Sequence, residues 1–158
     1  VGARLVGPAL TVLTAAGDNQ IVHAALDVVQ PGEVIVLNGF GDTTRALIGD
    51  LIAERALSLG VAGFVVDGCV RDVDAIRELG LPVFARGVTP AGPYKNGPGV
   101  IGGAVAIGGV AVLTGDVVVA ARGTFSVMSS RAFPYETRLV GLHGSLTPAE
   151  MLVPVLVL

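Results

Sequence analysis

Apolar residues in the first two thirds of the chain fall into short continuous runs, separated by stretches with helical spacing. The runs at 34–37 and 64–67 are typical of strands that are buried on both faces. Between them, apolar residues recur at helical spacing over 49–59, and Gly60 follows as a helix-ending glycine. Together with a glycine loop over 38–42 after the first run, this order predicts a βαβ unit and therefore a parallel sheet.

The same two patterns predict further elements on both sides of this unit. A helix begins after Asp18 or Asn19, either of which can cap it, and a Pro-Gly pair at 31–32 ends it. A proline-rich loop over 87–99 carries Lys95, the only lysine of the chain. The other predicted elements are strands over 5–14, 82–85 and 117–120, a short helix over 72–79, a hairpin of two short strands within 100–113, a helix start at 147–150 and a strand over 153–158.

Composition and charge narrow the class of protein. With 158 residues, of which 52% are hydrophobic, one compact domain is expected. Glycine, proline or charged residues interrupt every apolar run before the roughly 18 residues of a membrane span, so no membrane partner is predicted. The formal net charge of −3 and the aromatic content of 4% argue against nucleic acid as a partner.

Two features bear on the compartment. The single cysteine, Cys69, excludes an internal disulfide and a thiolate metal cluster, and it is compatible with a reducing cytoplasm. The chain starts at Val1 without a methionine and without the basic start and apolar stretch of a signal peptide. We therefore expect a cytoplasmic protein whose sequence is processed or truncated.

Charged residues gather where the strands of the predicted sheet end. They are Asp42, Asp50, Asp67, Arg71 and Asp72, in a chain with only 15% charged residues. The carboxyl ends of parallel strands meet at one edge of a sheet, where the N-termini of the following helices also point. The sequence therefore predicts a functional site at this edge.

The chemistry of this edge suits a small oxo-acid. Asp50 and Asp72 lie 22 residues apart, each in the first turn of a helix that follows a strand. Carboxylates of this kind can hold Mg²⁺, and the fork of Arg71 can bind a carboxylate through two hydrogen bonds. Acidic residues in a first helical turn are also common because of the helix dipole alone, so a structural role stays open. The helix-start amides expected to bind an anion are those of Gly49, Asp50, Leu51 and Ile52.

Three segments, 38–42, 46–53 and 60–72, resemble the RraA-like family. Its catalytic branch is the class II 4-hydroxy-4-methyl-2-oxoglutarate/4-carboxy-4-hydroxy-2-oxoadipate aldolases. The resemblance continues through the loop around Lys95 to Asp116 and covers residues 1–120. It implies an α/β fold, a swivelling β/β/α sandwich. It also implies a homo-oligomer, a trimer or hexamer, with sites at subunit boundaries.

The resemblance also implies roles for three residues. Asp72 would be the ligand of a divalent metal, Mg²⁺ or Mn²⁺. Arg71 would be a catalytic residue that holds the substrate together with the amides of 49–52. Asp50 would be a catalytic residue that acts on water held by the metal. The expected reaction is cleavage of a 4-hydroxy-2-oxo acid such as 4-hydroxy-4-methyl-2-oxoglutarate to pyruvate, with oxaloacetate decarboxylation as a further activity.

Two other functions compete with this one. The non-catalytic branch of the same family, regulators that bind a ribonuclease, lacks the aspartate after the arginine, so Asp72 favours the enzyme branch. Dinucleotide binding is suggested by the glycines at 39 and 41 after a strand, but Thr44 stands where the third glycine is expected. Cys69 is interpreted as a packed residue and His23 as a structural histidine, because neither has a partner in a recognisable motif.

The sequence departs from the family pattern at both ends. The family carries an additional helical segment before Val1, and an Asp-rich turn where this chain has residues 121–123. Residues 131–158 resemble the end of PglZ-type and related alkaline-phosphatase-superfamily domains, in which the counterpart of His143 can bind metal. The other ligands of such a metal are not recognisable here, so His143 alone predicts no phosphatase. We expect a core over 1–120 and a non-family tail over 121–158.

Overall fold

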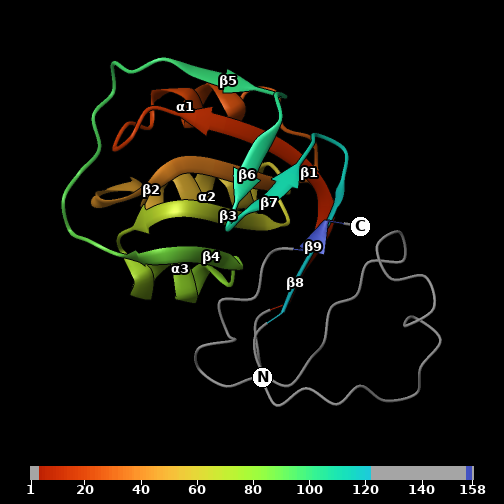
Figure 1. Cartoon of the computed structure of the whole chain (residues 1–158). Coiled ribbons are helices and arrows are strands. Elements are labelled where there is room, and N and C mark those ends of the chain that lie inside the picture. Colours follow the sequence, from red (N-terminus) through yellow and green to blue (C-terminus); the bar gives the residue numbers. More distant parts are fainter. Residues whose placement is uncertain (1–3, 122–155, 158) are drawn as a thin grey trace, which may run out of the picture.

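A computed structural model of the protein describes residues 4–121 and 156–157 (Figure 1). Seven strands form one sheet in the order β4-β3-β2-β1-β8-β9, with β5 paired to β1, and β6 and β7 form a separate pair. The strands are β1 (Arg4–Thr14), β2 (Val34–Ile48), β3 (Gly63–Val70), β4 (Val83–Val88), β5 (Gly99–Ile101), β6 (Val105–Ile107), β7 (Val110–Val112), β8 (Val117–Ala121) and β9 (Leu156–Val157). The helices are α1 (Gln20–Ala25), α2 (Asp50–Ser58) and α3 (Val73–Leu79).

The predicted βαβ unit is confirmed and is part of a longer series. Strands β1 to β4 are parallel neighbours, and the helices α1, α2 and α3 occur in the connections between them. Strands β5 and β8 both pair antiparallel with β1, on different parts of that long strand. The carboxyl ends of β2 and β3 therefore lie together, as the edge of the sheet where the site was expected.

Alternate residues of the central strands serve two separate cores. Ile35 and Leu37 of β2 pack with the helices, whereas Val34 and Val36 pack with the β6–β7 hairpin and β8. All four are fully buried. In Figure 1 the hairpin lies in front of the sheet and α2 lies behind it. Both faces of the strand at 34–37 are therefore covered, as its continuous apolar run predicted.

The prediction of a glycine loop over 38–42 is wrong, because β2 continues to Ile48 with three shifts of register against β3. Two residues in this segment have left-handed backbone angles, Phe40 (φ 58°) and Gly41 (φ 67°). Leu47 is fully buried, and a Cβ atom at Gly39 would lie 2.4 Å from its Cδ1 atom. The glycine at 39 therefore allows close packing of the strand on Leu47.

The dinucleotide interpretation is also wrong. It requires a helix that begins directly after the glycines at 39–41, so that its N-terminus faces a pyrophosphate. In the structure these residues lie inside β2, and the next helix begins at Asp50.

Several predicted boundaries change. α1 ends at Ala25, and the side chain of Asn19 makes no capping bond, whereas Asp18 accepts a hydrogen bond from the backbone N–H of Gln20 at 2.8 Å. The segment 100–113 contains three strands instead of two, because β5 joins β1 before the β6–β7 hairpin begins. The strand predicted over 153–158 has a counterpart in β9, which pairs antiparallel with β8.

Other predicted features of the tail fall on residues that the structure does not describe. The helix start at 147–150, His143 and the replaced turn at 121–123 lie outside the described residues, apart from the backbone of Ala121. Within the described residues, no helix is long and apolar enough to cross a membrane.

Candidate active site

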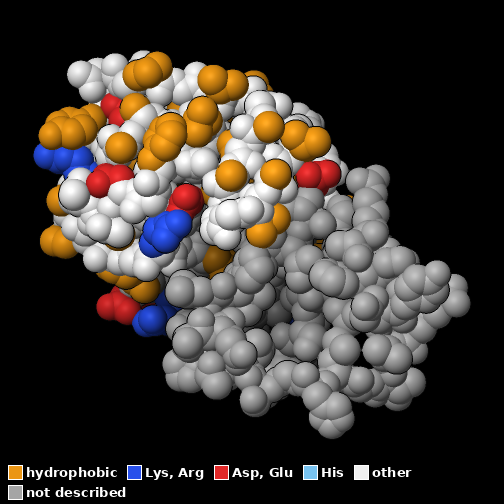
Figure 2. Space-filling view, in the orientation of Figure 1, with side chains coloured by type: hydrophobic (Ala, Val, Ile, Leu, Met, Phe, Trp, Pro, Cys, Tyr) orange, Lys and Arg blue, Asp and Glu red, His pale blue; other side chains and the backbone are white. Residues whose placement is uncertain are grey.

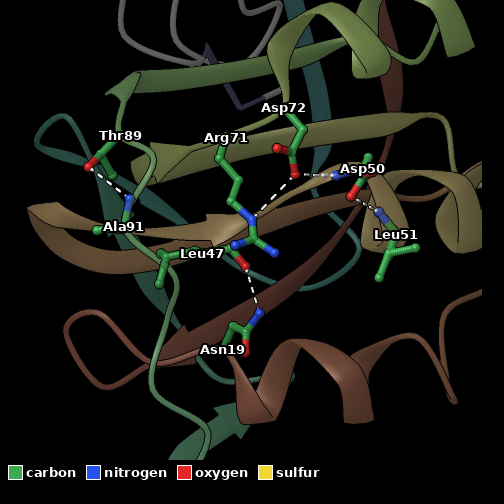
Figure 3. A network of polar contacts seen from close by, with 8 residues as sticks. All are labelled: Asn19, Leu47, Asp50, Leu51, Arg71, Asp72, Thr89 and Ala91. Atoms are coloured by element: carbon green, nitrogen blue, oxygen red, sulfur yellow. Dashed lines mark hydrogen bonds and ion pairs between the residues drawn. The ribbon is translucent and has the colours of Figure 1, made fainter.

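A pocket lies where the carboxyl ends of β2 and β3 meet the start of α2 (Figure 3). Residues 49–52 at the start of α2 and Arg71 just after β3 line the pocket. The rest of the lining comes from the start of α1, the end of β2 and the loop that follows β4: Asn19, His23, Ala46, Leu47, Pro93 and Lys95. Of the three residues predicted to carry chemistry, Asp50 and Arg71 line the pocket directly, and Asp72 contacts both of them.

Asp72 has an unusual backbone conformation that directs its side chain toward the helix start. Its φ and ψ are 54° and 40°, in the left-handed region, which aspartate tolerates better than most residues. One carboxylate oxygen, Oδ2, accepts a hydrogen bond from the Asp50 backbone N–H at 3.3 Å. The same oxygen lies 3.3 Å from Nε of Arg71. The turn between β3 and α3 thus joins both elements to the start of α2 (Figure 3).

Gly49 permits this close approach. A Cβ atom at this position would lie 2.6 Å from Oδ2 of Asp72 and 2.9 Å from Nε of Arg71. The backbone of Gly49 is extended, with φ −132°, so any residue could adopt it. The requirement for glycine is therefore one of space for the Arg71–Asp72 pair.

Unpaired amides at Asp50 and Leu51 were expected, and this expectation is wrong for the structure as it stands. The Leu51 N–H donates to Oδ1 of Asp50 at 2.8 Å, and the Asp50 N–H donates to Asp72. Helix-start amides lack partners within their helix, and carboxylates commonly satisfy them. An anionic ligand at these two amides would have to replace the carboxylates.

Backbone hydrogen bonds hold the strand ends in place around the pocket. The Arg71 N–H donates to the Ile48 carbonyl at 2.9 Å, which fixes the end of β3 against the end of β2. The side-chain amide of Asn19 donates to the Leu47 carbonyl at 3.1 Å (Figure 3). The Ala46 N–H donates to the carbonyl of Ala91 at 2.9 Å. The residues before Gly49 are therefore tied to α1, to β3 and to the loop after β4.

Two of the five clustered charges lie elsewhere. Asp67 forms an ion pair with Arg86 of β4, and Asp42 accepts hydrogen bonds from the N–H and hydroxyl of Thr44. Cys69 is buried, and burial, followed by the charge of Asp42, raises the pKa of its thiol. The thiol therefore stays protonated at neutral pH, which confirms its interpretation as a packed residue.

His23 and Lys95 also line the pocket, and neither was predicted as a site residue. The Nε2 atom of His23 is buried and has no hydrogen-bond partner among the described residues. Burial, then the charges of Lys95 and Arg55, lower the pKa of His23 below its ordinary value of 6.5, against the opposing effect of Asp27. His23 is therefore neutral at pH 7. The one available signal for Lys95 was that it is the only lysine of the chain.

Asp18 fixes the loop that carries Lys95. This residue is 2% exposed, and Oδ2 accepts hydrogen bonds from the N–H groups of Asn96 at 2.8 Å and Gly97 at 2.7 Å. Burial by itself would raise the pKa of Asp18. The hydrogen bonds from the backbone N–H groups of Gln20, Asn96 and Gly97 outweigh it, so that the pKa is lowered. The ionised form of Asp18 therefore stabilises the folded loop.

We expect Asp18→Ala to lower the free energy of unfolding by about 1–3 kcal/mol at pH 7, because backbone donors lose their charged acceptor. The contribution of the Asp18 charge is present above its ordinary pKa of 3.8 and is lost as the pH falls through the lower pKa of the folded state. Urea unfolding at several pH values should therefore show a gap between variant and wild type that narrows below pH 4. Asp74→Ala, which removes an exposed carboxylate, is the control. Equal stability of the Asp18 variant and wild type at pH 7 would contradict this role.

The carboxylates at the pocket fit a hard divalent cation. Mg²⁺ is typically held by one or two carboxylates and keeps several waters. The second oxygen of Asp72 points away from Asp50 in Figure 3, and it takes part in no hydrogen bond of the described residues. The backbone N–H of Asp50 contacts the other oxygen, Oδ2. No group of three or more His, Cys, Asp or Glu side chains among these residues is arranged to hold a metal, so a site that needs more protein ligands does not fit.

Relatives and solved structures resemble this chain over the core. A protein of Halalkalibacterium halodurans, provisionally named 4-hydroxy-4-methyl-2-oxoglutarate aldolase, is 47% identical over 116 residues, which are 73% of this chain and 55% of the relative. A protein of Ectopseudomonas mendocina with the same provisional name is 41% identical over 65% of this chain and 64% of the relative. The chain thus spans between half and two thirds of the length of these relatives.

Among solved structures, the RNA-processing inhibitor RraA from Thermus thermophilis aligns with a TM-score of 0.71 and 35% identity. The alignment covers 75% of this chain and 71% of that one. RraAS2 of Streptomyces coelicolor, described as an unusual member of the RNase ES inhibitor RraA family, aligns with a TM-score of 0.69 and 36% identity over 77% and 63% of the two chains. The fold is therefore the α/β fold of RraA-like proteins, as the resemblance implied. Residues 1–123 match the RraA-like family, described as Aldolase/RraA, and the chain belongs to this family.

Proposed function

We propose that this protein is a divalent-metal-dependent aldolase, a lyase that cleaves a 4-hydroxy-2-oxo acid such as 4-hydroxy-4-methyl-2-oxoglutarate to pyruvate. The observation that carries the proposal is the contact of Asp72 with both Arg71 and the start of α2. The provisional names of the relatives from two bacteria support the same reaction. Release of pyruvate, detected with lactate dehydrogenase and NADH in the presence of Mg²⁺, tests it.

The residues predicted as the site have separate roles in this reaction. Arg71 would bind the 2-oxo-carboxylate end of the substrate, because its planar fork matches two oxygens of that group. The amides of residues 49–52 would add donors from the helix N-terminus, and at Asp50 and Leu51 the substrate would replace the present carboxylate partners. Asp72 would hold Mg²⁺ or Mn²⁺, and the carboxylate of Asp50, whose backbone N–H donates to Asp72, would accept a proton from water. A divalent cation bound there would supply Lewis-acid polarisation of the 2-oxo group.

The reaction breaks the bond between C3 and C4 of the substrate. The C4 hydroxyl loses its proton and becomes a carbonyl, while the electron pair of the broken bond moves toward the 2-oxo group. Arg71, which is directed into the pocket beside the start of α2, is placed to stabilise this negative charge (Figure 3). A proton added at C3 then completes pyruvate. Oxaloacetate decarboxylation places the same demand on the site, because it also leaves charge on a 2-oxo acid.

Arg71→Lys should lower kcat/KM by about 10- to 150-fold, because lysine keeps the charge but loses one of two charge-assisted hydrogen bonds. Affinity for Mg²⁺ should change little, since Arg71 is not proposed as a ligand. A substrate analogue with an amide in place of the bound carboxylate should show no such loss. Steady-state kinetics with both compounds measure this. An equal loss for acid and amide, or loss of metal binding, would instead show that Arg71 only anchors the turn.

A second candidate function is that of a non-enzymatic regulator that binds a ribonuclease. The structural neighbour from Thermus thermophilis, described as an RNA-processing inhibitor, is the observation that favours it. The two functions differ in one cheap observation, because a regulator releases no pyruvate from the oxo-acid at any metal concentration.

We further propose that the protein is a cytoplasmic homo-oligomer, a trimer or hexamer. Three large apolar side chains, of α2, β2 and β4, are strongly exposed: Leu51 (72%), Phe40 (66%) and Val88 (65%). Figure 2 shows further apolar side chains over the upper part of the visible face, where Figure 1 has β5 and α1. Exposed apolar groups of this size are typical of association surfaces. Sedimentation at several micromolar should give three or six times the chain mass, and a stable monomer would contradict the proposal.

A further inference from the structure

Two positively charged side chains line the pocket. Arg71 follows β3 beside the N-terminus of α2, and Lys95 belongs to the loop after β4, which contributes Pro93 to the same lining. Building on the proposed function, which places the 2-oxo acid at Arg71, we propose that Lys95 is a specificity-determining residue. It binds a second carboxylate, at the far end of a dicarboxylic 2-oxo acid.

Lys95 has no carboxylate partner among the described residues. The four ion pairs found there join Arg55 to Asp27, Arg71 to Asp72, Arg77 to Asp74 and Arg86 to Asp67. Arg45, which precedes the pocket residues of β2, stacks on the ring of Tyr94 and donates to the carbonyl of Gly92. The charge of Lys95 is therefore available for an anion in the pocket.

The neighbours of Lys95 on both sides are fixed to the body of the protein. The Tyr94 N–H donates to the carbonyl of Gly17 at 2.8 Å, and the Tyr94 carbonyl accepts a hydrogen bond from the N–H of Asn19 at 3.0 Å. On the other side, the N–H of Asn96 donates to the carboxylate of Asp18. The backbone of Lys95 is thus held in place although its side chain is exposed. A residue held in this way can distinguish ligands by the position of their charge.

The charges of the pocket also favour a dianion. Its lining contains two cations, Arg71 and Lys95, and one carboxylate, that of Asp50. His23, the other titratable group beside Lys95, is neutral at pH 7 because of burial and the nearby positive charges, which lower its pKa. A ligand with a single carboxylate would satisfy Arg71 but leave Lys95 without a partner.

Binding of two acids of equal chain length tests the role of Lys95 without any turnover. 2-Oxoglutarate has a second carboxylate at the position where 2-oxopentanoate has a methyl group. Calorimetric titration of the full chain with both acids, in the presence of Mg²⁺, gives the ratio of their dissociation constants. Wild type should bind 2-oxoglutarate at least about tenfold more tightly than 2-oxopentanoate, as expected for one charge-assisted hydrogen bond.

Lys95→Gln should bring this ratio close to one. It should weaken the binding of 2-oxoglutarate and leave the dissociation constant of 2-oxopentanoate unchanged. Arg77→Gln is the matched control, because it removes one exposed positive charge of α3 outside the pocket and should keep the wild-type ratio. A preference that persists in Lys95→Gln, or is absent in wild type, would overturn the assignment of Lys95.

The outcome is separate from that of the proposed function. A wild-type preference for 2-oxoglutarate that is lost in Lys95→Gln supports the role of Lys95 even if no pyruvate is released from a 4-hydroxy-2-oxo acid. Conversely, pyruvate release at the same kcat/KM from a monocarboxylic and a dicarboxylic 4-hydroxy-2-oxo acid would support the aldolase and overturn the role of Lys95.

Discussion

Aldolase turnover should fall to near background in Asp72→Asn, a loss of more than about a hundredfold, even at high Mg²⁺ concentration. Asparagine has the size of aspartate but not its charge, so the proposed metal ligand is removed with little change in shape. The left-handed backbone at this position, with φ 54°, is also tolerated by asparagine. The free energy of unfolding should therefore stay close to that of wild type.

Steady-state kinetics across a Mg²⁺ titration, together with urea unfolding, measure both effects. Asp74→Asn provides a matched control, because it changes an exposed carboxylate two residues away that pairs with Arg77. Near-normal turnover of Asp72→Asn would show that Asp72 is not the metal ligand. A large loss of stability would show that its main role is to hold the turn before α3.

Gly49→Ala should lower kcat/KM by about a hundredfold while the protein stays folded. The added Cβ atom would lie 2.6 Å from Oδ2 of Asp72 and 2.9 Å from Nε of Arg71, so both side chains have to move. They are 37% and 39% exposed and can swing toward solvent without disturbing the core. Displacement of reacting groups by about 1 Å is enough to cost on the order of a hundredfold in rate.

Kinetics and circular dichroism of Gly49→Ala test this, with Gly103→Ala as the control. At Gly103, which does not line the pocket, a Cβ atom would meet only a methyl group of Val100, at 3.2 Å. Full activity of Gly49→Ala would mean that the observed contact of Arg71 with Asp72 is not needed for the reaction.

The regular part of the fold could be predicted from hydrophobic periods alone. The helix expected over 49–59 is found as α2 (Asp50–Ser58), and the strand expected over 64–67 is the middle of β3. The segment after Asn38 could not be predicted, because its glycines favour a loop locally. Tertiary packing of Leu47 between Gly39 and Gly68 instead keeps it as an irregular strand.

The site was predictable to a similar degree. The rule that strand ends of a parallel sheet meet at one edge placed Asp50, Arg71 and Asp72 together, and the structure brings these three into contact. The rule did not separate them from Asp42 and Asp67, which bond to other partners. Asp67 pairs with Arg86 of the neighbouring strand β4, a partner that the spacing of the charges does not indicate.

Lys95 could not be assigned to the pocket from the sequence, because its loop has no hydrophobic period. Hydrogen bonds from Asn96 and Gly97 to Asp18, nearly 80 residues earlier in the chain, decide where this loop lies. His23 was hidden for a related reason. Its position in α1 was clear, but the approach of that helix to the start of α2 was not.

The central claim is that the pocket lined by Arg71 and the start of α2, with Asp72 in contact with both, cleaves a 4-hydroxy-2-oxo acid. The most direct measurement follows 4-hydroxy-4-methyl-2-oxoglutarate labelled with ¹³C at C2 by NMR, with the full chain and Mg²⁺. The label should appear at C2 of pyruvate, and a chelator or Asp72→Asn should stop its appearance. Intact substrate with the wild-type chain across a Mg²⁺ and Mn²⁺ titration would contradict the claim.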